Sequence, residues 1–318
     1  MSEGTKSNLR VGVIGVGAIG KNHARCLAEI EHCDLTAIFD KDQKLAAELA
    51  KEYGATAVGS LEEFCELVDA ATVAAPTSLH LELGSKLLNA GKHVLVEKPI
   101  TDNVDDAKTL VRLAQEKQRI LQVGHIERFN PVLAELEHRI NDPKFIEAHR
   151  LSPFPNRSLD IGVVLDVMIH DIEIVLHLVK SELESIDAVG VPVLTKREDI
   201  ANARLRFKNG CVANITASRI SPEKLRKIRV FQGDAYLSLD YQEQEGEIYR
   251  KGLLGIKKEK VEIEKDEPLK VELASFCECA AKGYAPRVGG QQAAAALQVA
   301  VQITELIESG DGRLELPT

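Results

Sequence analysis

A glycine-rich stretch near the start of the 318-residue chain, Ile14-Gly15-Val16-Gly17-Ala18-Ile19-Gly20-Lys21, limits the possible folds more than any other feature. Its G-x-G-x-x-G spacing separates an apolar β-branched run from an amphipathic stretch, which predicts a strand, a tight turn and a helix. A turn that binds no nucleotide is one interpretation. The other is a dinucleotide site, where Gly15 makes the turn, Gly17 admits a pyrophosphate, and Gly20 lets the helix pack closely on the strand. The phosphates would then lie on N–H groups at the helix start, where Ala18 and Ile19 stand.

An acidic residue ends the next predicted strand. Asp40 follows Ala37-Ile38-Phe39 and stands twenty positions after Gly20. A carboxylate there accepts hydrogen bonds from ribose hydroxyls and repels a 2′-phosphate, so NAD is favoured over NADP. Lys41 weakens that preference, because a cation tolerates a phosphate. An unrelated surface aspartate is the alternative.

The first third of the chain alternates short β-branched runs with longer amphipathic stretches, which is typical of βα units and a parallel sheet. We predict an α/β fold, a Rossmann-type doubly wound parallel sheet. The expected strands are Val11–Ile14, Leu35–Phe39, Ala71–Ala74, His93–Val96 and Ile120–Val123, and the expected helices are Ile19–Ile30, Gln43–Tyr53, Leu61–Leu67, Leu79–Ala90 and Val104–Lys117.

The pattern changes after Val123. Strand follows strand from Ile186 to about Ile263, with turn signals at 208–210 and 232–234, which predicts an α+β domain with a large, mostly antiparallel sheet. We expect a nucleotide-binding domain over 1–124 and a substrate-binding and oligomerisation domain over 125–318, with the C-terminal helices free to pack back on the first domain. The helices expected in this half are Val132–Ile140, Val164–Val179, Leu269–Lys282 and Gln291–Glu308.

The charge balance indicates what the protein binds. Forty basic and forty-nine acidic residues give a net charge of −9, which argues against nucleic-acid or membrane partners and for a small molecule. No leader or membrane-spanning run is visible, so we expect a soluble, cytoplasmic protein. The six cysteines form no CxxC pair and no metal quartet, so we expect reduced thiols and no metal.

Two further motifs carry residues with acid–base chemistry. Glu97-Lys98-Pro99 ends a predicted buried strand, at the sheet edge where ligands bind, so the Lys98 ammonium is a candidate to face a nicotinamide. Asp166 and His170 stand four apart and would share one face of a helix. An ordinary solvated lysine and a satisfied core histidine are the alternatives.

Taken together, the glycine loop, Ala75-Pro76-Thr77-Ser78-Leu79-His80 and Glu97-Lys98-Pro99 resemble the Gfo/Idh/MocA family of sugar and cyclitol oxidoreductases. The resemblance runs nearly to the end of the chain, through 286–290. It implies that Lys98 is catalytic, beside the reacting hydroxyl. It also implies that Pro76, Thr77, His80 and Glu97 belong to the cofactor site.

The family's Asp-x-Gly-x-His motif resembles Asp166-Val167-Met168-Ile169-His170, with Met168 in place of glycine and the preceding glycine run reduced to Gly162. The resemblance implies that His170 is the acid/base. His170 would remove the hydroxyl proton, Lys98 would stabilise the alkoxide, and the carbon would deliver a hydride to the nicotinamide. Asp166 would hold the imidazole or contact a neighbouring substrate hydroxyl.

The segment 124–131 starts the second domain and supplies candidate substrate residues, Arg128 and Asn130, with Arg157 as a further anion contact. An arginine fixed in an interdomain ion pair is the alternative. This segment and the Asp166 motif look most like the nucleotide-sugar branch, the UDP-N-acetylglucosamine 3-dehydrogenases that begin 3-amino-sugar synthesis for lipid A.

Other functions remain open from the sequence. A dehydrogenase of a free sugar or cyclitol, a glycosidase that retains its NAD, and a catalytically silent NAD-binding regulator fit the same motifs. A metal hydrolase is poorly supported, because Asp166, His170 and Asp171 do not make a zinc ligand set. The second sheet has more surface than its helices cover, so we expect a homodimer or homotetramer through that sheet.

Overall fold

The computed structural model describes residues 8–154, 161–253 and 255–316. These residues belong to two compact units. The first contains the chain up to Ile126 together with Glu267–Ala294, and the second contains the rest, so the boundary near the C-terminus falls inside the last helix.

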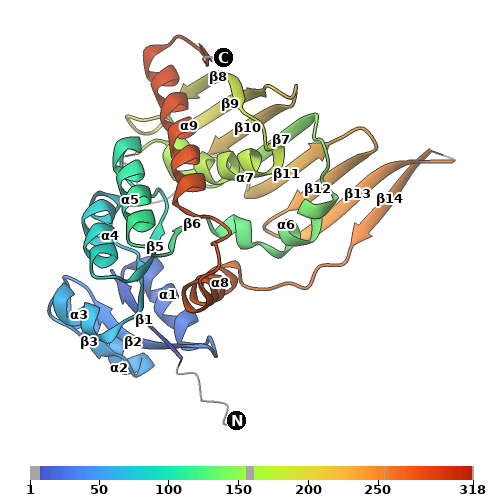
Figure 1. The fold of residues 1–318 in the computed structure, drawn as a ribbon. Helices are drawn as coiled ribbons and strands as arrows, with labels where there is room; N and C mark the ends of the chain where they lie inside the picture. The colour runs from blue at the N-terminus through green and yellow to red at the C-terminus, as the bar shows by residue number, and fades with distance from the viewer. Residues whose placement is uncertain (1–7, 155–160, 254, 317–318) are drawn as a thin grey trace. The chain divides into compact units, whose positions relative to one another are not determined.

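The first unit is built on a parallel sheet with the strand order β3-β2-β1-β4-β5-β6 among its described residues, and Figure 1 labels most of these strands. This order reverses between β1 and β4 and is that of doubly wound dinucleotide-binding domains, so the predicted fold class of this half is confirmed. Its elements are β1 (Leu9–Ile14), α1 (Ala18–Ala28), β2 (Cys33–Phe39), α2 (Gln43–Tyr53), β3 (Thr56–Ala57), α3 (Leu61–Leu67), β4 (Ala70–Val73), η1 (Thr77–Leu79), α4 (His80–Asn89), β5 (His93–Glu97), α5 (Val104–Glu116), β6 (Leu121–Gly124) and α8 (Pro268–Lys282).

Successive residues of β1 point to opposite faces of this sheet. Val11 and Val13 join the core formed with α1, α2 and α8, where α1 and α8 lie side by side. Gly12 points the other way, because a Cβ on it would lie 2.3 Å from the Phe64 ring of α3. Helices α4 and α5 pack on that second face, where Leu110 meets Gly84.

Local chemistry explains where several of these helices begin. The side chains of Asp42, Ser60 and Asn103 each accept a hydrogen bond from a backbone N–H of the first turn of α2, α3 and α5, which is the N-cap arrangement. Gly54 ends α2 with a φ of +71°, a conformation that glycine adopts without strain. The observed bounds of α2 and α3 are those predicted from the sequence.

The second unit is built on a sheet with the strand order β14-β13-β12-β11-β7-β10-β9-β8-β15 among the described residues, antiparallel except between β7 and β10. Its large, mostly antiparallel sheet confirms the predicted α+β class. Its elements, with the helix shared between the units, are η2 (Ile126–Phe129), α6 (Pro131–Leu136), η3 (Glu137–Arg139), β7 (Phe145–Leu151), η4 (Val164–Met168), α7 (Ile169–Val179), β8 (Leu183–Val191), β9 (Ile200–Phe207), β10 (Val212–Ser218), β11 (Leu225–Phe231), β12 (Ala235–Asp240), β13 (Glu245–Gly252), β14 (Gly255–Val261), α9 (Gly290–Ser309) and β15 (Arg313–Glu315).

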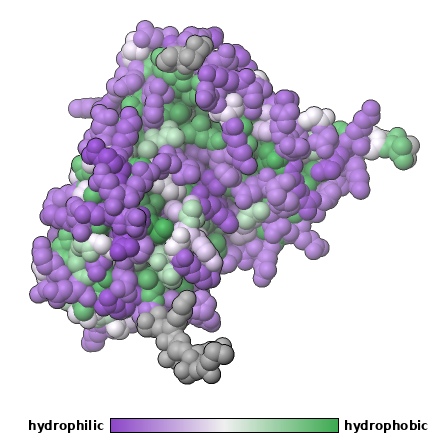
Figure 2. All heavy atoms as spheres, in the orientation of Figure 1, coloured by the Kyte–Doolittle hydropathy of each residue, from purple (hydrophilic) through white to green (hydrophobic). Residues whose placement is uncertain are grey.

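The two faces of the nine-stranded sheet differ in burial. One face is buried under α7, which contacts β7 and β10. The other is half-exposed and carries stacked aromatic rings from four strands, Phe145, Phe231, Tyr236 and Tyr249. Figure 2 views the molecule from the side of α7 and shows mostly hydrophilic side chains on that surface, with hydrophobic side chains at the end of the β13–β14 hairpin.

Strand β7 lies in the middle of the sheet, yet we did not predict it. Its buried side chains are Ile146, Ala148 and Arg150, so the alternation that marks a strand is hidden by a charged residue. Arg150 is buried because two carboxylates neutralise it. The predicted helix Val132–Ile140 is also shorter, since α6 ends at Leu136 and a 3-10 turn follows.

Candidate active site

The glycine loop of the first unit leaves no room for side chains at two of its three glycines. Gly15 has a φ of +82°, and a Cβ on it would lie 2.9 Å from the backbone of Ala74. A Cβ on Gly20 would lie 1.8 Å from the carbonyl oxygen of Gly15. Gly15 therefore permits the turn between β1 and α1, and Gly20 permits the helix to approach it.

Gly17 is different, because a Cβ built on it meets no protein atom within 4 Å. It stands at the N-cap of α1, before Ala18 and Ile19, and the first turn of the helix carries no acidic side chain. The N–H groups of a helix start favour an anion. The open space at Gly17 therefore fits a pyrophosphate, which a methyl group at this position would obstruct.

Asp40 lies directly after β2 and is held against the glycine loop. Its Oδ2 accepts a hydrogen bond from the N–H of Val16 at 2.6 Å, and its Oδ1 accepts one from the N–H of Asp42 at 2.8 Å. These two bonds fix the orientation of the carboxylate beside the loop. Contact between Asp40 and a ribose stays a prediction.

The segment after β4 is tied to the segment after β5 by His80. The His80 ring is buried, and its two nitrogens lie 3.0 Å from the carbonyl oxygens of Pro99 and Ala75. The described contacts of this side chain are thus with the backbone. Pro76 and Thr77 start the 3-10 turn η1 at the carboxyl end of β4, the same sheet edge as the glycine loop. Their contact with a cofactor, like that of His80, stays a prediction.

Glu97 and Lys98 lie at the end of β5, at that same edge. The Glu97 carboxylate accepts hydrogen bonds from His23 Nε2 of α1 at 3.0 Å and from the N–H of Lys98 at 3.2 Å. Burial favours the protonated form, but the hydrogen bond and charge of His23 and the charge of Lys98 outweigh it and lower the pKa of Glu97. An anchored carboxylate therefore stands next to the candidate catalytic lysine.

Glu272 of α8 is a second acidic residue in this unit, and we did not single it out from the sequence. Its side chain is fully buried, and neither carboxyl oxygen has a hydrogen-bond partner among the described residues. Burial, followed by the charge of Glu97, raises the pKa of Glu272 well above its ordinary value. The two shifts have opposite directions, so they favour a proton on Glu272 and an ionised Glu97. The sequence does hold a signal, since Glu272 shares the helical face of the buried Phe276 and Cys279.

The protonated state of Glu272 makes stability depend on pH. In the unfolded chain this carboxyl ionises near 4.5, so above that pH unfolding releases a proton and stability falls as the pH rises. Glu272→Gln has no proton to release. The difference in unfolding free energy between variant and wild type should therefore shift in favour of the variant by up to about 1.4 kcal/mol per pH unit from pH 5 to pH 8.

Urea unfolding of both proteins at several pH values measures that difference. Glu278→Gln is the matched control, because Glu278 lies on the same helix, is exposed and pairs with Lys282. The difference in unfolding free energy between Glu278→Gln and the wild type should stay nearly constant with pH. A constant difference for Glu272→Gln as well would show that Glu272 is ionised in the folded protein.

Asp166 and His170 belong to the second unit, at the start of its long buried helix. The helix expected over 164–179 does not begin as an α-helix, because η4 is a π-helical turn in which the Ile169 N–H donates to the carbonyl of Val164. Such turns recur at functional sites. Asp166 and His170 are half-buried, whereas Met168 is fully buried.

Arg128 and Asn130 are engaged inside the second unit. Arg128 is 3% exposed and its Nη1 donates to Glu173 at 2.7 Å. Asn130 caps α6 through the N–H of Val132 and donates to the carbonyl of Tyr241 at 3.0 Å. The described ion pair of Arg128 therefore lies within one unit. Substrate contact by either residue stays a prediction, and Arg157 lies outside the described residues.

A buried set of charges surrounds this pair. The guanidinium of Arg150 donates to both oxygens of Asp171, at 2.8 and 2.9 Å, and to Glu127 at 2.7 Å. Burial raises the pKa of Glu173 to about 7, although Arg128 opposes the shift. Buried charges of this kind need their partners, so this network gives Arg128 a structural role in addition to any binding role.

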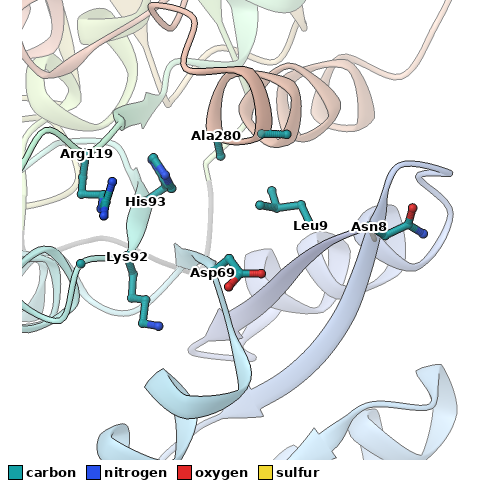
Figure 3. Close-up of a pocket in the computed structure, with 9 residues that line it drawn as sticks. Asn8, Leu9, Asp69, Lys92, His93, Arg119 and Ala280 are labelled. Carbon is teal, nitrogen blue, oxygen red and sulfur yellow. The ribbon is translucent and has the colours of Figure 1, made fainter. Parts of the chain in front are cut away.

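A pocket of about 400 Å³ in the first unit is lined by Asn8, Asp69, Lys92, His93 and Arg119, among others, as Figure 3 shows. These residues stand at or before the amino ends of β1, β4, β5 and β6. Ligands of doubly wound sheets bind outside the carboxyl ends of the strands. The pocket is therefore at the opposite edge of the sheet from the glycine loop and is not the dinucleotide site.

Metal-binding clusters and membrane-spanning helices are both absent from the described parts of the chain. Within them, His, Cys, Asp and Glu side chains form no group of three or more that could hold a metal ion. The helices there are all too short or too polar to cross a membrane.

Comparison with known proteins identifies the class to which this arrangement belongs. The sequence model described as "Oxidoreductase family, NAD-binding Rossmann fold" matches residues 9–125, and the "GFO/IDH/MocA C-terminal domain" matches residues 130–236. The nucleotide-binding fold and these matches define an oxidoreductase that acts on CH–OH groups. The chain belongs to the Gfo/Idh/MocA family, as its motifs suggested.

Some named relatives match nearly the whole chain. UDP-N-acetylglucosamine 3-dehydrogenase of Acidithiobacillus ferrooxidans is 36% identical over 312 residues, 95% of this chain and 99% of that protein. Its solved structure has a TM-score of 0.91, with 95% and 98% of the two chains covered. The scyllo-inositol 2-dehydrogenase (NAD(+)) of Bacillus subtilis is 25% identical over 95% of both chains. A levoglucosan dehydrogenase solved with NADH shares the fold at 18% identity and a TM-score of 0.88, with 98% of this chain and 100% of that chain covered.

Proposed function

We propose that the protein is an NAD-dependent dehydrogenase that oxidises the 3-hydroxyl of UDP-N-acetylglucosamine to the 3-keto sugar, the step that opens 3-amino-sugar synthesis for lipid A. The observation that carries the proposal is the end-to-end similarity to a UDP-N-acetylglucosamine 3-dehydrogenase, at 36% identity over 95% of the chain. The motif residues Lys98, Asp166 and His170 are all present in this chain.

Each motif residue has a defined role in this proposal. His170 removes the proton from the hydroxyl, and the ammonium of Lys98 donates a hydrogen bond to the oxygen as negative charge develops on it. Asp166 orients the imidazole or binds a neighbouring hydroxyl. A nicotinamide held at the glycine loop would supply the acceptor for the hydride that leaves the carbinol carbon. Glu97 supports Lys98 through the hydrogen bond that it accepts from the Lys98 N–H.

The preference for NAD over NADP rests on Asp40. The carboxylate is fixed beside the glycine loop by the N–H groups of Val16 and Asp42. A 2′-phosphate next to that anion would be repelled, whereas ribose hydroxyls would donate to it. The pyrophosphate would lie on the open space at Gly17 and the N-terminus of α1. This placement makes Gly15, Gly17, Ala18, Ile19 and Gly20 the nucleotide loop.

The half-exposed face of the nine-stranded sheet supports self-association. It carries the stacked aromatic rings and cross-strand ion pairs such as Arg229–Glu147 and Lys258–Glu247. A face that carries apolar rings and paired charges suits contact with a copy of itself across a two-fold axis. We therefore include a homodimer or homotetramer through this face in the proposal.

The proposal is tested with the purified full chain, NAD and UDP-N-acetylglucosamine. NADH formation is followed by absorbance, with a carbonyl trap present because oxidation of a sugar hydroxyl by NAD is unfavourable near neutral pH. We expect turnover with this substrate, and little with NADP in place of NAD or with free N-acetylglucosamine or myo-inositol in place of the nucleotide sugar.

Other outcomes distinguish the competing functions. Turnover restricted to a free sugar or cyclitol would overturn the substrate and keep the dehydrogenase. Release of a glycosidic product without net NADH would indicate a glycosidase that retains its NAD. Tight NAD binding with no turnover on any of these compounds would indicate a regulator.

A further inference from the structure

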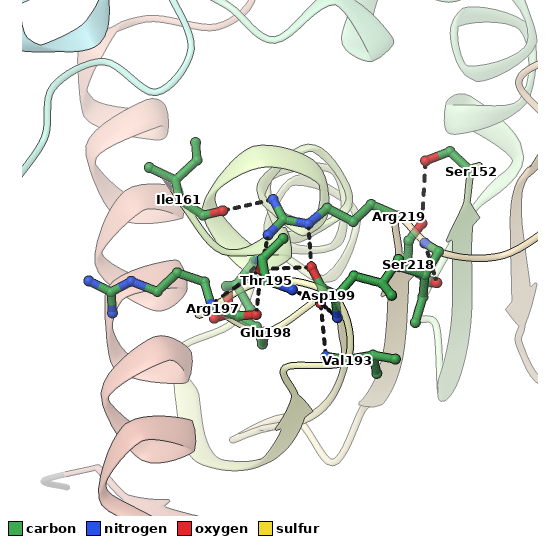
Figure 4. A network of polar contacts seen from close by, with 12 residues as sticks. Ser152, Ile161, Val193, Thr195, Arg197, Glu198, Asp199, Ser218 and Arg219 are labelled. Atoms are coloured by element: carbon green, nitrogen blue, oxygen red, sulfur yellow. Dashed lines mark hydrogen bonds and ion pairs between the residues drawn. The ribbon is translucent and has the colours of Figure 1, made fainter. Parts of the chain in front are cut away.

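The segment that leads into the candidate catalytic helix is held by a buried polar network in the second unit. Arg219, at the end of β10, is fully buried, and its guanidinium points toward the backbone of Ile161, as Figure 4 shows. Its Nη1 donates to the Ile161 carbonyl at 2.7 Å and its Nε donates to Asp199 at 2.9 Å. The strand β10 is thereby connected to the chain just before η4.

Asp199 fixes the loop between β8 and β9. Its Oδ2 accepts hydrogen bonds from three consecutive N–H groups, those of Val193, Leu194 and Thr195, at 2.6 to 2.9 Å. The loop is therefore built around a buried carboxylate that Arg219 neutralises. Glu198, the neighbour of Asp199, belongs to the same loop and is 4% exposed.

Glu198 contacts the first residues of the helix directly. Its Oε1 accepts a hydrogen bond from the N–H of Val164 at 3.2 Å, and its backbone carbonyl accepts one from the N–H of Val163 at 2.9 Å. A Cβ on Gly162 would lie 1.8 Å from the same Oε1. Gly162, retained where the family carries a glycine run, therefore makes room for this carboxyl group.

Val164 is the first residue of the π-helical turn. Its N–H is held by Glu198, and its carbonyl accepts from Ile169, five residues on. In an α-helix that carbonyl would accept from Met168 instead, and a change of one residue in register rotates the downstream part of the helix by about 100°. The directions of Asp166 and His170 relative to each other thus depend on keeping the wider turn.

We propose that Glu198 is a positioning residue for the acid/base pair Asp166 and His170, acting through the N–H of Val164. The Asp199–Arg219 pair holds Glu198 in place. The inference rests on the proposed function, in which His170 is the base. Glu198 lies outside the motifs described above, and in this inference it keeps the start of the helix in its π-helical form.

A double-mutant cycle on the full chain tests the contact. Glu198→Ala removes the acceptor for the Val164 N–H, and Gly162→Ala displaces the carboxyl group. We expect each to lower kcat about 10- to 100-fold, with the Kd for NAD unchanged, because the nucleotide loop belongs to the first unit. Since both changes break one contact, the double variant should be no worse than either single variant.

Two further variants separate positioning from a loss of stability. Glu198→Gln keeps an oxygen that accepts from Val164 and should retain turnover within about threefold of wild type. Arg197→Ala changes the adjacent residue, which is exposed and pairs with Glu308, and should match wild type. Equal kcat for wild type and Glu198→Ala, or equal loss for Glu198→Gln and Glu198→Ala, would overturn the proposal.

Hydrogen exchange gives a readout that needs no substrate. We expect the peptide that covers 163–170 to exchange at least about tenfold faster in Glu198→Ala than in Glu198→Gln. If the wild-type protein does not oxidise UDP-N-acetylglucosamine, the proposed function fails but this comparison still stands. Unchanged exchange in Glu198→Ala would overturn the positioning role whatever the substrate.

Discussion

Replacement of Lys98 by methionine, or of His170 by glutamine, should lower kcat about 10²- to 10⁴-fold while the Kd for NAD stays within about twofold. Methionine keeps most of the length of the lysine side chain and removes the charge that stabilises the developing alkoxide. Glutamine keeps a polar group in place of the imidazole and removes the base. Steady-state turnover with UDP-N-acetylglucosamine and NAD, together with titration of NAD alone, measures both quantities.

Matched controls make this result specific. Lys86→Met removes an exposed lysine that pairs with Glu82 on α4, and His138→Gln removes an exposed histidine of η3. Both should behave as wild type. Full turnover in Lys98→Met or His170→Gln with normal NAD binding would show that the acid–base roles have been assigned to the wrong residues.

Alanine substitutions at two glycines of the same loop should impair different properties, stability in one case and NAD binding in the other. Gly20→Ala places a methyl group 1.8 Å from a backbone oxygen, so we expect a loss of stability on the order of 3 kcal/mol or more. Gly17→Ala meets no protein atom within 4 Å. It should unfold at the wild-type temperature within about 2 °C and bind NAD at least about tenfold more weakly, because its methyl group lies where the pyrophosphate approaches.

Thermal unfolding and NAD titration separate these outcomes. Each variant is the control for the other, since both add one methyl group to the glycine loop. Normal NAD affinity in Gly17→Ala would contradict the placement of the pyrophosphate. Normal stability in Gly20→Ala would contradict the close approach of α1 to Gly15.

Short apolar runs alternate with amphipathic stretches in the first third of the chain. This pattern allowed almost all strands and helices of the first unit to be predicted from the sequence. The predicted starts of α2, α3 and α5 were right, and in the structure the side chains of Asp42, Ser60 and Asn103 cap these helices. The short strand β3 was missed because two residues carry too little pattern. Strand β7 was missed because its buried positions include Arg150.

Some residues of the candidate site could also be predicted from the sequence, whereas others could not. The glycine loop, Asp40, Lys98 and His170 were proposed from the sequence, because each belongs to a short motif or stands at a fixed distance from one. The residues that hold these side chains and the start of the candidate catalytic helix in place were not predicted from the sequence. His23 lies 74 residues from Glu97, and Glu198 lies 34 residues from Val164, so no local spacing connects them.

The sequence by itself determined the class of fold and marked the glycine loop and the candidate residues for acid–base chemistry. These depend on short-range rules, namely side-chain periodicity, the backbone freedom of glycine and the chemistry of each side chain. Only the tertiary structure decided which ionisable groups are buried and how the helix that carries Asp166 and His170 begins. Burial raises the pKa of Glu272, the neutralised Asp199–Arg219 pair fixes Glu198, and the π-helical turn depends on that contact. Each of these depends on which distant residues fill the space around a polar group, and that is set when the chain packs.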